Sequence, residues 1–364
     1  MGHLDGLVKE RVKFLSQEPD RLRGLRGREL YESLGQLGLT HTQFFRALGT
    51  NAQDYCAQEF GIDVSKVTVE RFFQSDPNAK WLFPDIVREA VLAGIRRRPA
   101  YRSLIARDEP VPGTAYDIPY VVENTEEEEP RVVAEGAAIP EAELTYGDRV
   151  VRLTKLGRGV IASYEAIRRM SVDLLRVHLQ RIGERMGRQY DYVLAATLVA
   201  GDAPDGGNAA TVVNTATANA WVYDDILAGF LKLGVEHYFT PTHMLANADL
   251  CKTILGMDEL KDAAVFDFAK TGNLPSPLGM KLVPMEDQPA NKLTILDANY
   301  AAIKLTEQDV LVESDKLINQ QWERTYLTTV TAFALLYPKA RVVVKSDWTY
   351  GGQGYGVWGM GFGV

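Results

Sequence analysis

A glycine-rich stretch near the C-terminus has the spacing of a dinucleotide-binding loop. GYGVWG, from Gly354 to Gly359, fits the pattern G-x-G-x-x-G. In such a loop the glycines follow a strand and open a helix whose N-terminus binds the pyrophosphate. Met360–Val364 are too few residues for that helix, for the next strand and for the acidic ribose ligand. The stretch therefore predicts no nucleotide cofactor.

The same stretch belongs to a tail, 347–364, that is rich in aromatic residues as well as glycines. Such a tail is too apolar to be a free, solvated segment. Its glycines allow close approach to another backbone, and its aromatic side chains can act as anchors. We therefore expect it to pack in an extended form. The residues selected as its anchors are Trp348, Tyr355 and Trp358.

Histidine and cysteine residues show no spacing typical of a metal site or a catalytic nucleophile. His237 and His243 are six residues apart, which is not a helical ligand spacing. Cys56 and Cys251 form neither a disulfide framework nor a zinc motif, and two cysteines so far apart are typical of a reducing cytosol. We interpret Cys251 as a small buried residue. We expect no catalytic residue, no metal and no cofactor. The alternative is an α/β enzyme that uses Cys251 or the glycine tail.

Four consecutive glutamates form the most concentrated charge in the sequence. They lack the alternating oxygen positions of a calcium loop. Two interpretations are open, a solvated loop and an electrostatic docking strip. The glutamates are Glu126, Glu127, Glu128 and Glu129. The basic partners selected for the docking interpretation are Arg96, Arg97 and Arg98, with Arg168 and Arg169 as a second candidate.

Length and composition indicate a large globular protein. The chain has 364 residues, of which 46% are hydrophobic, enough for two domains or one large domain. The net charge of −8 gives no general attraction to nucleic acid. The N-terminus has no apolar signal-peptide core, and no run approaches the roughly 18 apolar residues of a membrane span. We expect a soluble intracellular protein with no membrane partner.

The elements that would position these residues begin with helices. Residues 1–75 carry apolar side chains at three- and four-residue spacing, which predicts several short helices. A further helix is predicted from Pro84 to Arg98, because proline suits the first turn of a helix and Pro99 ends it.

A long hairpin is predicted next, with its turn near Gly136–Pro140. Apolar residues alternate on both sides of this turn, which indicates two antiparallel strands. The strands contain few large apolar residues, and a hairpin of this kind forms no core of its own. It must lie against another surface, which is the first indication of a protein that assembles.

The clearest element is a helix from Val172 to about Ala200. Ser171 is a good N-cap, no proline interrupts the segment, and Gly201-Asp202 ends it. At ~1.5 Å per residue it is about 40 Å long. Residues 203–305 then alternate helix and strand signals, which is typical of a compact α/β unit. Strand-like segments after residue 305 are predicted to return beside the long helix.

Three blocks in this order resemble the major capsid protein of tailed double-stranded DNA phages, which has the Hong Kong 97 type fold. VVAEGAAIPEAELTY (132–146) resembles the extended hairpin loop of that family. PLGMKLVPMEDQPANKLTILD (277–297) resembles its paired strands ending near an aspartate, and FALLYPKARVVVK (333–345) its closing strand. The long helix between the first two blocks matches the spine helix. The resemblance covers about residues 83–344.

The resemblance implies an α+β fold divided into seven parts. They are an N-terminal helical extension (1–75), an N-terminal arm (76–114), the extended hairpin loop (115–162), the peripheral domain with its spine helix (163–202), the axial domain (203–305), the peripheral strands (306–346) and the tail (347–364). The sequence departs from the family at Asp148, where some members have a cross-linking lysine, so no isopeptide chemistry is expected. We expect residues 1–75 to be a retained extension or part of an uncleaved form.

The implied function is structural. Copies of the chain would form hexamers and pentamers of an icosahedral phage head around double-stranded DNA, without enzyme activity. The implied partners are the chain itself, a portal, scaffolding or decoration proteins, and DNA in non-specific contact. The implied location is the virion, and the host cytoplasm during assembly. The alternative is an encapsulin-type shell that encloses an enzyme, although the N-terminal extension argues against it.

Overall fold

The computed structural model describes residues 28–36, 44–45, 49–76, 78–97, 100–121, 132–133, 135, 144–202, 208–260, 277–317 and 322–348. The helices in these ranges are α3 (Arg28–Gln36), α5 (Ala52–Phe60), α6 (Val69–Ser75), α7 (Phe83–Arg97), α8 (Tyr164–Arg169), α9 (Val172–Ala200), α10 (Tyr223–Leu231) and α11 (Ala248–Leu255). Short 3-10 or π turns lie at Ala79–Leu82, Tyr101–Ser103, Lys232–Glu236, Pro277–Gly279 and Pro338–Ala340.

The strands are β1 (Arg107–Pro110), β2 (Ala115–Val121), β3 (Leu144–Arg152), β4 (Thr154–Ser163), β5 (Thr211–Asn214), β6 (His243–Ala246), β7 (Lys281–Pro284), β8 (Lys292–Leu296), β9 (Ala302–Leu317), β10 (Trp322–Leu335) and β11 (Arg341–Lys345). Within the described residues they form a four-stranded sheet ordered β1-β9-β10-β4, a five-stranded sheet ordered β5-β11-β8-β6-β7, and the pair β2-β3. This arrangement of helices and mixed sheets confirms the predicted α+β class.

The predicted long helix is confirmed as α9. Ser171 caps it, because its Oγ accepts a hydrogen bond from the backbone N–H of Leu174 at 3.2 Å. Gly201 ends it with φ of 98°, a conformation that favours glycine. The buried apolar residues of its inner face include Leu179, Met186, Tyr190, Leu194 and Leu198.

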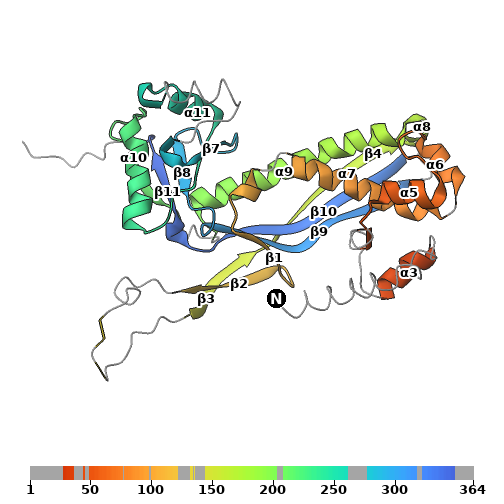
Figure 1. The fold of residues 1–364 in the computed structure, drawn as a ribbon, viewed down its shortest axis with the longest axis horizontal. Coiled ribbons are helices and arrows are strands. Elements are labelled where there is room, and N and C mark those ends of the chain that lie inside the picture. The colour runs from red at the N-terminus through yellow and green to blue at the C-terminus, as the bar shows by residue number, and fades with distance from the viewer. Residues whose placement is uncertain are drawn as a thin grey trace, which may run out of the picture.

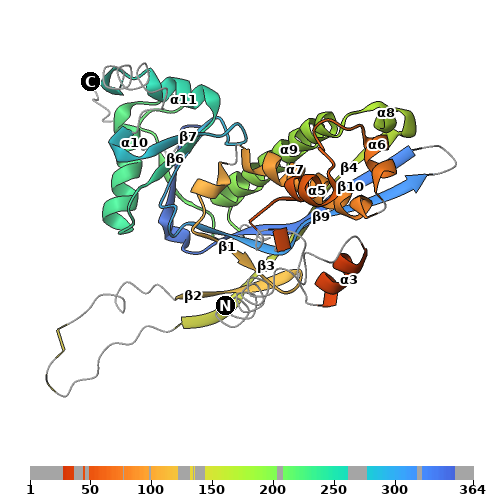
Figure 2. The same cartoon turned by 45° about the vertical axis from the view of Figure 1, so that its right-hand side comes forward.

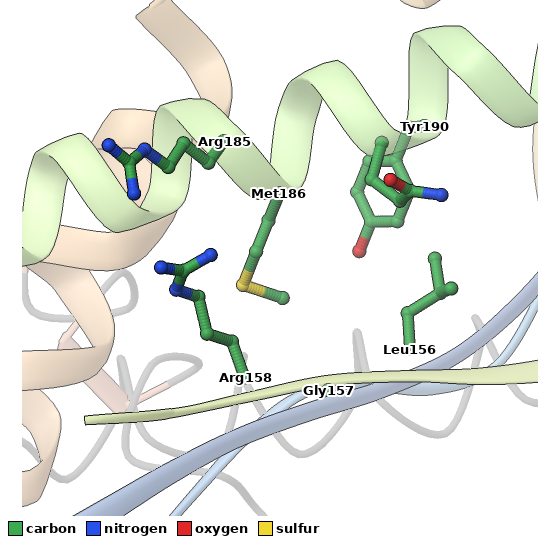
Figure 3. Close-up of a pocket in the computed structure, with 7 residues that line it drawn as sticks. Leu156, Gly157, Arg158, Arg185, Met186 and Tyr190 are labelled. Atoms are coloured by element: carbon green, nitrogen blue, oxygen red, sulfur yellow. The ribbon is translucent and has the colours of Figure 1, made fainter. Parts of the chain in front are cut away.

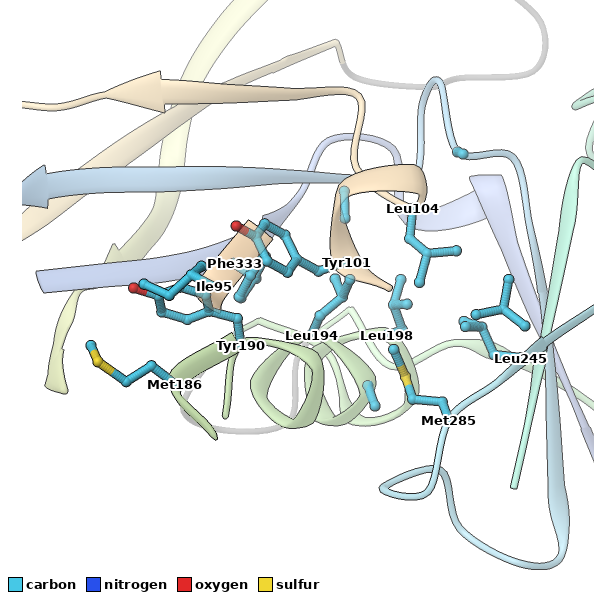
Figure 4. Packing of buried hydrophobic residues seen from close by; sticks show 14 of the residues in the cluster. Ile95, Tyr101, Leu104, Met186, Tyr190, Leu194, Leu198, Leu245, Met285 and Phe333 are labelled. Atoms are coloured by element: carbon cyan, nitrogen blue, oxygen red, sulfur yellow. The ribbon is translucent and has the colours of Figure 1, made fainter. Parts of the chain in front are cut away.

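Helices α7 and α9 form a layer over one face of the four-stranded sheet (Figures 1 and 2). Ile95, Leu194 and Phe333 lie in the core between the layers (Figure 4). Tyr101 packs edge-to-face on Tyr190, with ring centroids 5.5 Å apart, and on Phe333, at 5.9 Å. The long helix is thereby held as a rigid spine along the sheet.

Glycines allow α7 and α9 to approach until their backbones touch. A Cβ added at Gly183 of α9 would lie 2.1 Å from the carbonyl oxygen of Val91. A Cβ added at Gly94 of α7 would lie 2.0 Å from the carbonyl oxygen of Gln180. Real Cβ atoms do not approach other atoms so closely, so both positions require glycine at this helix spacing.

The five-stranded sheet forms a second core with α10 and α11. Apolar residues of both helices pack with those of β8 and β11, including Ile226, Ile254 and Ile295. Arg341, fully buried at the start of β11, joins this unit to the spine. Its Nε donates to the carbonyl oxygen of Leu198 at 2.6 Å, and its two Nη atoms donate to the carbonyl oxygens of Pro338 and Asn208.

Strand β11 lies in a different sheet from the one that we expected. β9 and β10 return along the spine as predicted, but β11 pairs with β5 and β8 in the five-stranded sheet. The turn at Pro338–Ala340 and the buried Arg341 redirect the chain between the two sheets. The first residues of β9, from Ala302, conversely belong to the four-stranded sheet.

The predicted hairpin is present as β2 and β3, paired from Ala115↔Arg152 to Val121↔Leu144. The last part of the expected hairpin loop, 154–162, separates from the hairpin after Leu153, because β4 pairs with β10 in the four-stranded sheet. The turn expected near 136–140 lies outside the described residues. In Figures 1 and 2 the hairpin extends from one end of the four-stranded sheet while β4 runs the other way.

The described part of the N-terminal extension packs on its own chain. Phe44, Tyr55 and Phe72 share a small core with Ile86 of α7 and Val172 of α9. The backbone N–H of Ala52 also donates to the carboxylate of Glu89 on α7 at 3.1 Å. Short helices were predicted in this region, and α3, α5 and α6 confirm them.

Candidate assembly surfaces

The cysteines considered for catalysis or metal binding are buried, and His237 contacts the backbone. Cys56 and Cys251 are buried, and burial raises the pKa of the Cys251 thiol to about 11. His237 Nδ1 lies 2.8 Å from the carbonyl oxygen of Lys339. The part of the chain that the structure describes contains no group of three or more His, Cys, Asp or Glu residues that could hold a metal ion. Among the described helices, none is both long and apolar enough to cross a bilayer.

The first predicted arginine cluster lies at the C-terminal end of α7, and the structure describes two of its three members. Arg96 is exposed, and Arg98 lies outside the described residues. Arg97 forms an ion pair with Glu184 of α9 at 3.0 Å. The hydrogen bond from Arg181, followed by the nearby Arg97, holds the pKa of Glu184 below its usual value. Arg97 therefore joins α7 to α9 within one subunit.

The second predicted cluster lies on α8. Arg169 is exposed, whereas the side chain of Arg168 lies outside the described residues. The acidic run Glu126–Glu129 also lies outside them, so its pairing with either arginine cluster stays a prediction.

The first predicted tail anchor, Trp348, contacts the five-stranded sheet. Its indole N–H donates to Thr215 Oγ1 at 3.3 Å, and Thr215, which follows β5, is buried. We expected this tail on the peripheral domain or on a neighbouring subunit, so the observed contact places its first residues on a different unit of the same chain. Tyr355 and Trp358 lie outside the described residues.

A buried lysine that the sequence analysis missed joins β1, a strand within the arm, to the rest of the four-stranded sheet. Lys304 of β9 donates to Asp108 of β1 at 2.8 Å. Its ammonium group also lies 5.4 Å from the ring centre of Tyr190 and 6.0 Å from that of Tyr101. Burial raises the pKa of Tyr190 to about 12. No pattern in the sequence distinguishes this lysine from a solvated one.

The sequence analysis also missed a pocket between β4 and α9. Its volume is about 210 Å³. Figure 3 shows Arg158 from β4 and Arg185 from α9 with their guanidinium groups near each other, and Met186 between them and Tyr190. Alternation along β4 could have placed Arg158 and Leu156 on one face, but not opposite α9.

Several solved structures have a similar fold. The capsid of a native GTA particle has a TM-score of 0.51 and 15% identity, covering 68% of this chain and 90% of that one. A structure from Mycobacterium phage Che8 has a TM-score of 0.50 and 14% identity, covering 69% of this chain and 93% of that one. The holo-SrpI encapsulin complex from Synechococcus elongatus PCC 7942 has a TM-score of 0.48 and 12% identity, covering 69% and 88%.

A spine helix on a four-stranded sheet, a second α/β unit and a projecting hairpin define a shell protein with the Hong Kong 97 type fold. A family model described as phage capsid protein matches residues 146–346, more than half of the chain. The chain belongs to this phage capsid protein family, and it is a structural protein of the capsid shell. No curated protein matches the chain.

Proposed function

We propose that copies of this chain assemble as hexamers and pentamers into the icosahedral head of a tailed phage, which encloses double-stranded DNA. The observation that carries the proposal is the projecting hairpin in a chain of the capsid family. Each hairpin would lie across a neighbouring subunit, and contacts repeated around a closed shell reinforce one another.

Burial along the hairpin supports this role. At its base Ile118 and Val151 are buried against residues of the four-stranded sheet, such as Ile303. Val150, on the neighbouring position of β3, is 42% exposed. A two-stranded sheet is at best marginally stable in water, and a partner subunit would supply the missing surface.

The two sheets would have separate places in the shell. We assign α9 with the four-stranded sheet to the peripheral domain and the five-stranded sheet with α10 and α11 to the axial domain, near the centres of hexamers and pentamers. The arm, 76–114, packs on its own subunit, because α7 lies against α9 and β1 pairs with β9. The role is structural rather than catalytic, and no cofactor takes part.

The proposed partners beyond the chain itself are a portal, scaffolding or decoration proteins and the packaged DNA. With a net charge of −8, the subunit has no excess of positive charge with which to condense DNA. DNA would therefore be driven in by a packaging motor and would touch the wall non-specifically. The protein would be part of the virion, and would be in the host cytoplasm during assembly.

Electron microscopy of the full-length protein tests the proposal. We expect closed shells of uniform diameter, and shells purified from infected cells should protect DNA from nuclease. A soluble monomer under all assembly conditions would overturn the proposal. Shells that contain a co-purified enzyme and no DNA would support the encapsulin-type alternative instead.

Shortening the hairpin tests its role directly. Residues 122–143 are replaced by Asn-Gly, a two-residue turn that suits antiparallel strands, so that β2 and β3 are joined at Val121 and Leu144. We expect a folded subunit that forms no closed shells, because the base of the hairpin keeps its core. Circular dichroism and thermal unfolding check the fold, and electron microscopy checks assembly. Shells at the wild-type yield would contradict the proposed role.

A further inference from the structure

The pocket between β4 and α9 contains two arginines that have no acidic partner among the described residues. Arg158 and Arg185 are both exposed, and neither forms an ion pair within the described residues. Other arginines of α9 do have partners, since Arg181 pairs with Glu184 at 2.5 Å and Arg188 with Glu286 at 2.8 Å. In the part of the chain that the structure describes, the two guanidinium groups that share the pocket therefore have no carboxylate partner.

The pocket suits a carboxylate on a chain that also has an apolar part. Adjacent guanidinium groups repel each other unless an anion lies between them, and each can donate two parallel hydrogen bonds to a carboxylate. Figure 3 shows both guanidinium groups at one end of the pocket and Leu156 and Tyr190 at the other. The methylene groups of a glutamate side chain can contact this apolar end while its carboxylate binds the arginines.

We propose that this pocket binds the acidic run Glu126–Glu129 of a second copy of the chain. This inference rests on the proposed function, because it requires two subunits side by side. The run supplies four successive carboxylates and is the strongest local negative charge in the sequence. It lies in the segment 122–143 that joins the two strands of the projecting hairpin.

The direction of the hairpin favours a second copy of the chain as the source of the run. β3 leads from Arg152 outward to Leu144, whereas β4 leads the other way to Arg158, 14 residue positions from Leu144. Val121 pairs with Leu144 at the outer end. An extended chain covers at most ~3.5 Å per residue, so even Glu129 reaches less than about 30 Å from Val121.

The structure favours this pocket over the arginines selected from the sequence. Arg97 is already paired with Glu184 at 3.0 Å, and the exposed Arg96 and Arg169 lie on two different helices. Arg158 and Arg185 are brought together by folding, although 27 positions separate them in the sequence.

Charge reversal with rescue tests the proposal. The variants are R158E/R185E, the Glu126–Glu129 quadruple change to lysine, and both sets combined in one chain. We expect each separate set to lower the shell yield at least about tenfold, because like charges then face each other between subunits. The combined variant should recover most of the wild-type yield. R96E/R169E is the matched control, with the same change in charge at exposed arginines outside the pocket, and should assemble normally.

Two readouts separate this proposal from misfolding and from the proposed function. Thermal unfolding of the unassembled subunits must be the same for all variants, so a loss of shells is not a loss of fold. If the wild type forms no shells, the proposed function fails. If it forms shells and R158E/R185E assembles equally well, or the combined variant is no better than either set, the pocket proposal alone is overturned. Normal shells that have lost only their DNA would also overturn it, and would indicate a phosphate contact.

Discussion

The contact between α7 and α9 predicts that Gly183→Ala destabilises the subunit, although alanine is the better helix former. The added Cβ would lie 2.1 Å from the carbonyl oxygen of Val91 and 3.0 Å from the backbone nitrogen of Ile95. Both atoms belong to the backbone of α7, so no side chain can rotate away. The helices must separate by about 1 Å to restore ordinary contact distances.

The size of the effect follows from two opposing terms. Replacing glycine by alanine inside a helix favours folding by ~1 kcal/mol. Overpacking a well-packed contact costs ~1–3 kcal/mol, and the rigid backbone at Val91 places Gly183 at the upper end of that range. We expect a net loss of about 2 kcal/mol in the free energy of unfolding, which lowers the unfolding temperature by a few degrees.

Gly187→Ala is the matched control on the same helix. Its Cβ would lie 3.2 Å from the nearest atom, the carbonyl oxygen of Ile95, so a small shift relieves the contact. The control retains the gain in helix propensity without the severe clash. Calorimetry of the two unassembled variants should show Gly183→Ala unfolding several degrees below Gly187→Ala. Equal unfolding temperatures would refute the inference that the two backbones touch at Gly183.

Two further predictions concern buried polar groups. Arg341→Met should lower the free energy of unfolding by about 3 kcal/mol or more, since each buried carbonyl left without a donor costs ~1–3 kcal/mol. An unchanged midpoint of urea unfolding would contradict this. Asp191 accepts hydrogen bonds from the backbone N–H groups of Tyr101 at 2.8 Å and Ala100 at 3.4 Å, and burial raises its pKa. Wild-type stability should therefore fall as the pH rises above ~4, the unfolded pKa, until Asp191 is ionised in the folded state. Asp191→Asn removes this dependence. The difference in unfolding temperature between the variant and the wild type should therefore shift in favour of the variant as the pH rises through this interval. Parallel curves would contradict the assignment.

The spine helix could be predicted in full because its signals are local. Ser171, the absence of proline and Gly201 fix where α9 begins and ends, and three- and four-residue spacing fixes its buried face. The same sequence does not reveal that Gly183 touches α7, since a glycine on a helix face is compatible with solvent as well as with another backbone. Whether the helix forms depends on its own segment, whereas its contact with α7 depends on the rest of the fold.

The strands show the same limit at the level of sheets. The run RVVVK of β11 is apolar on both faces, which indicates a buried strand but not the sheet to which it belongs. Its position between β5 and β8 depends on the turn before it and on Arg341, whose burial no local pattern indicates.

The candidate site was predictable only as a set of charges. The glutamates and the adjacent arginines attract notice because they are consecutive, and consecutive residues share one element. Arg158 and Arg185 are on different elements and meet only when β4 packs under α9. The contact of Lys304 is equally hidden in the sequence, because its partner Asp108 lies on β1, which is far away along the chain.

The position of β11 affects the order in which the subunit can form on the ribosome. β11 is the last described strand, yet it lies inside the five-stranded sheet, where it is the neighbour of β5 and separates it from β8. A nascent chain that stops before residue 341 leaves β5 without its partner strand and Leu198 without the donor from Arg341. Domains commonly fold from the N-terminus during synthesis, but this unit must wait until almost the whole chain has emerged. Incomplete chains therefore lack a finished five-stranded sheet, and we expect only chains that include β11 to join a shell.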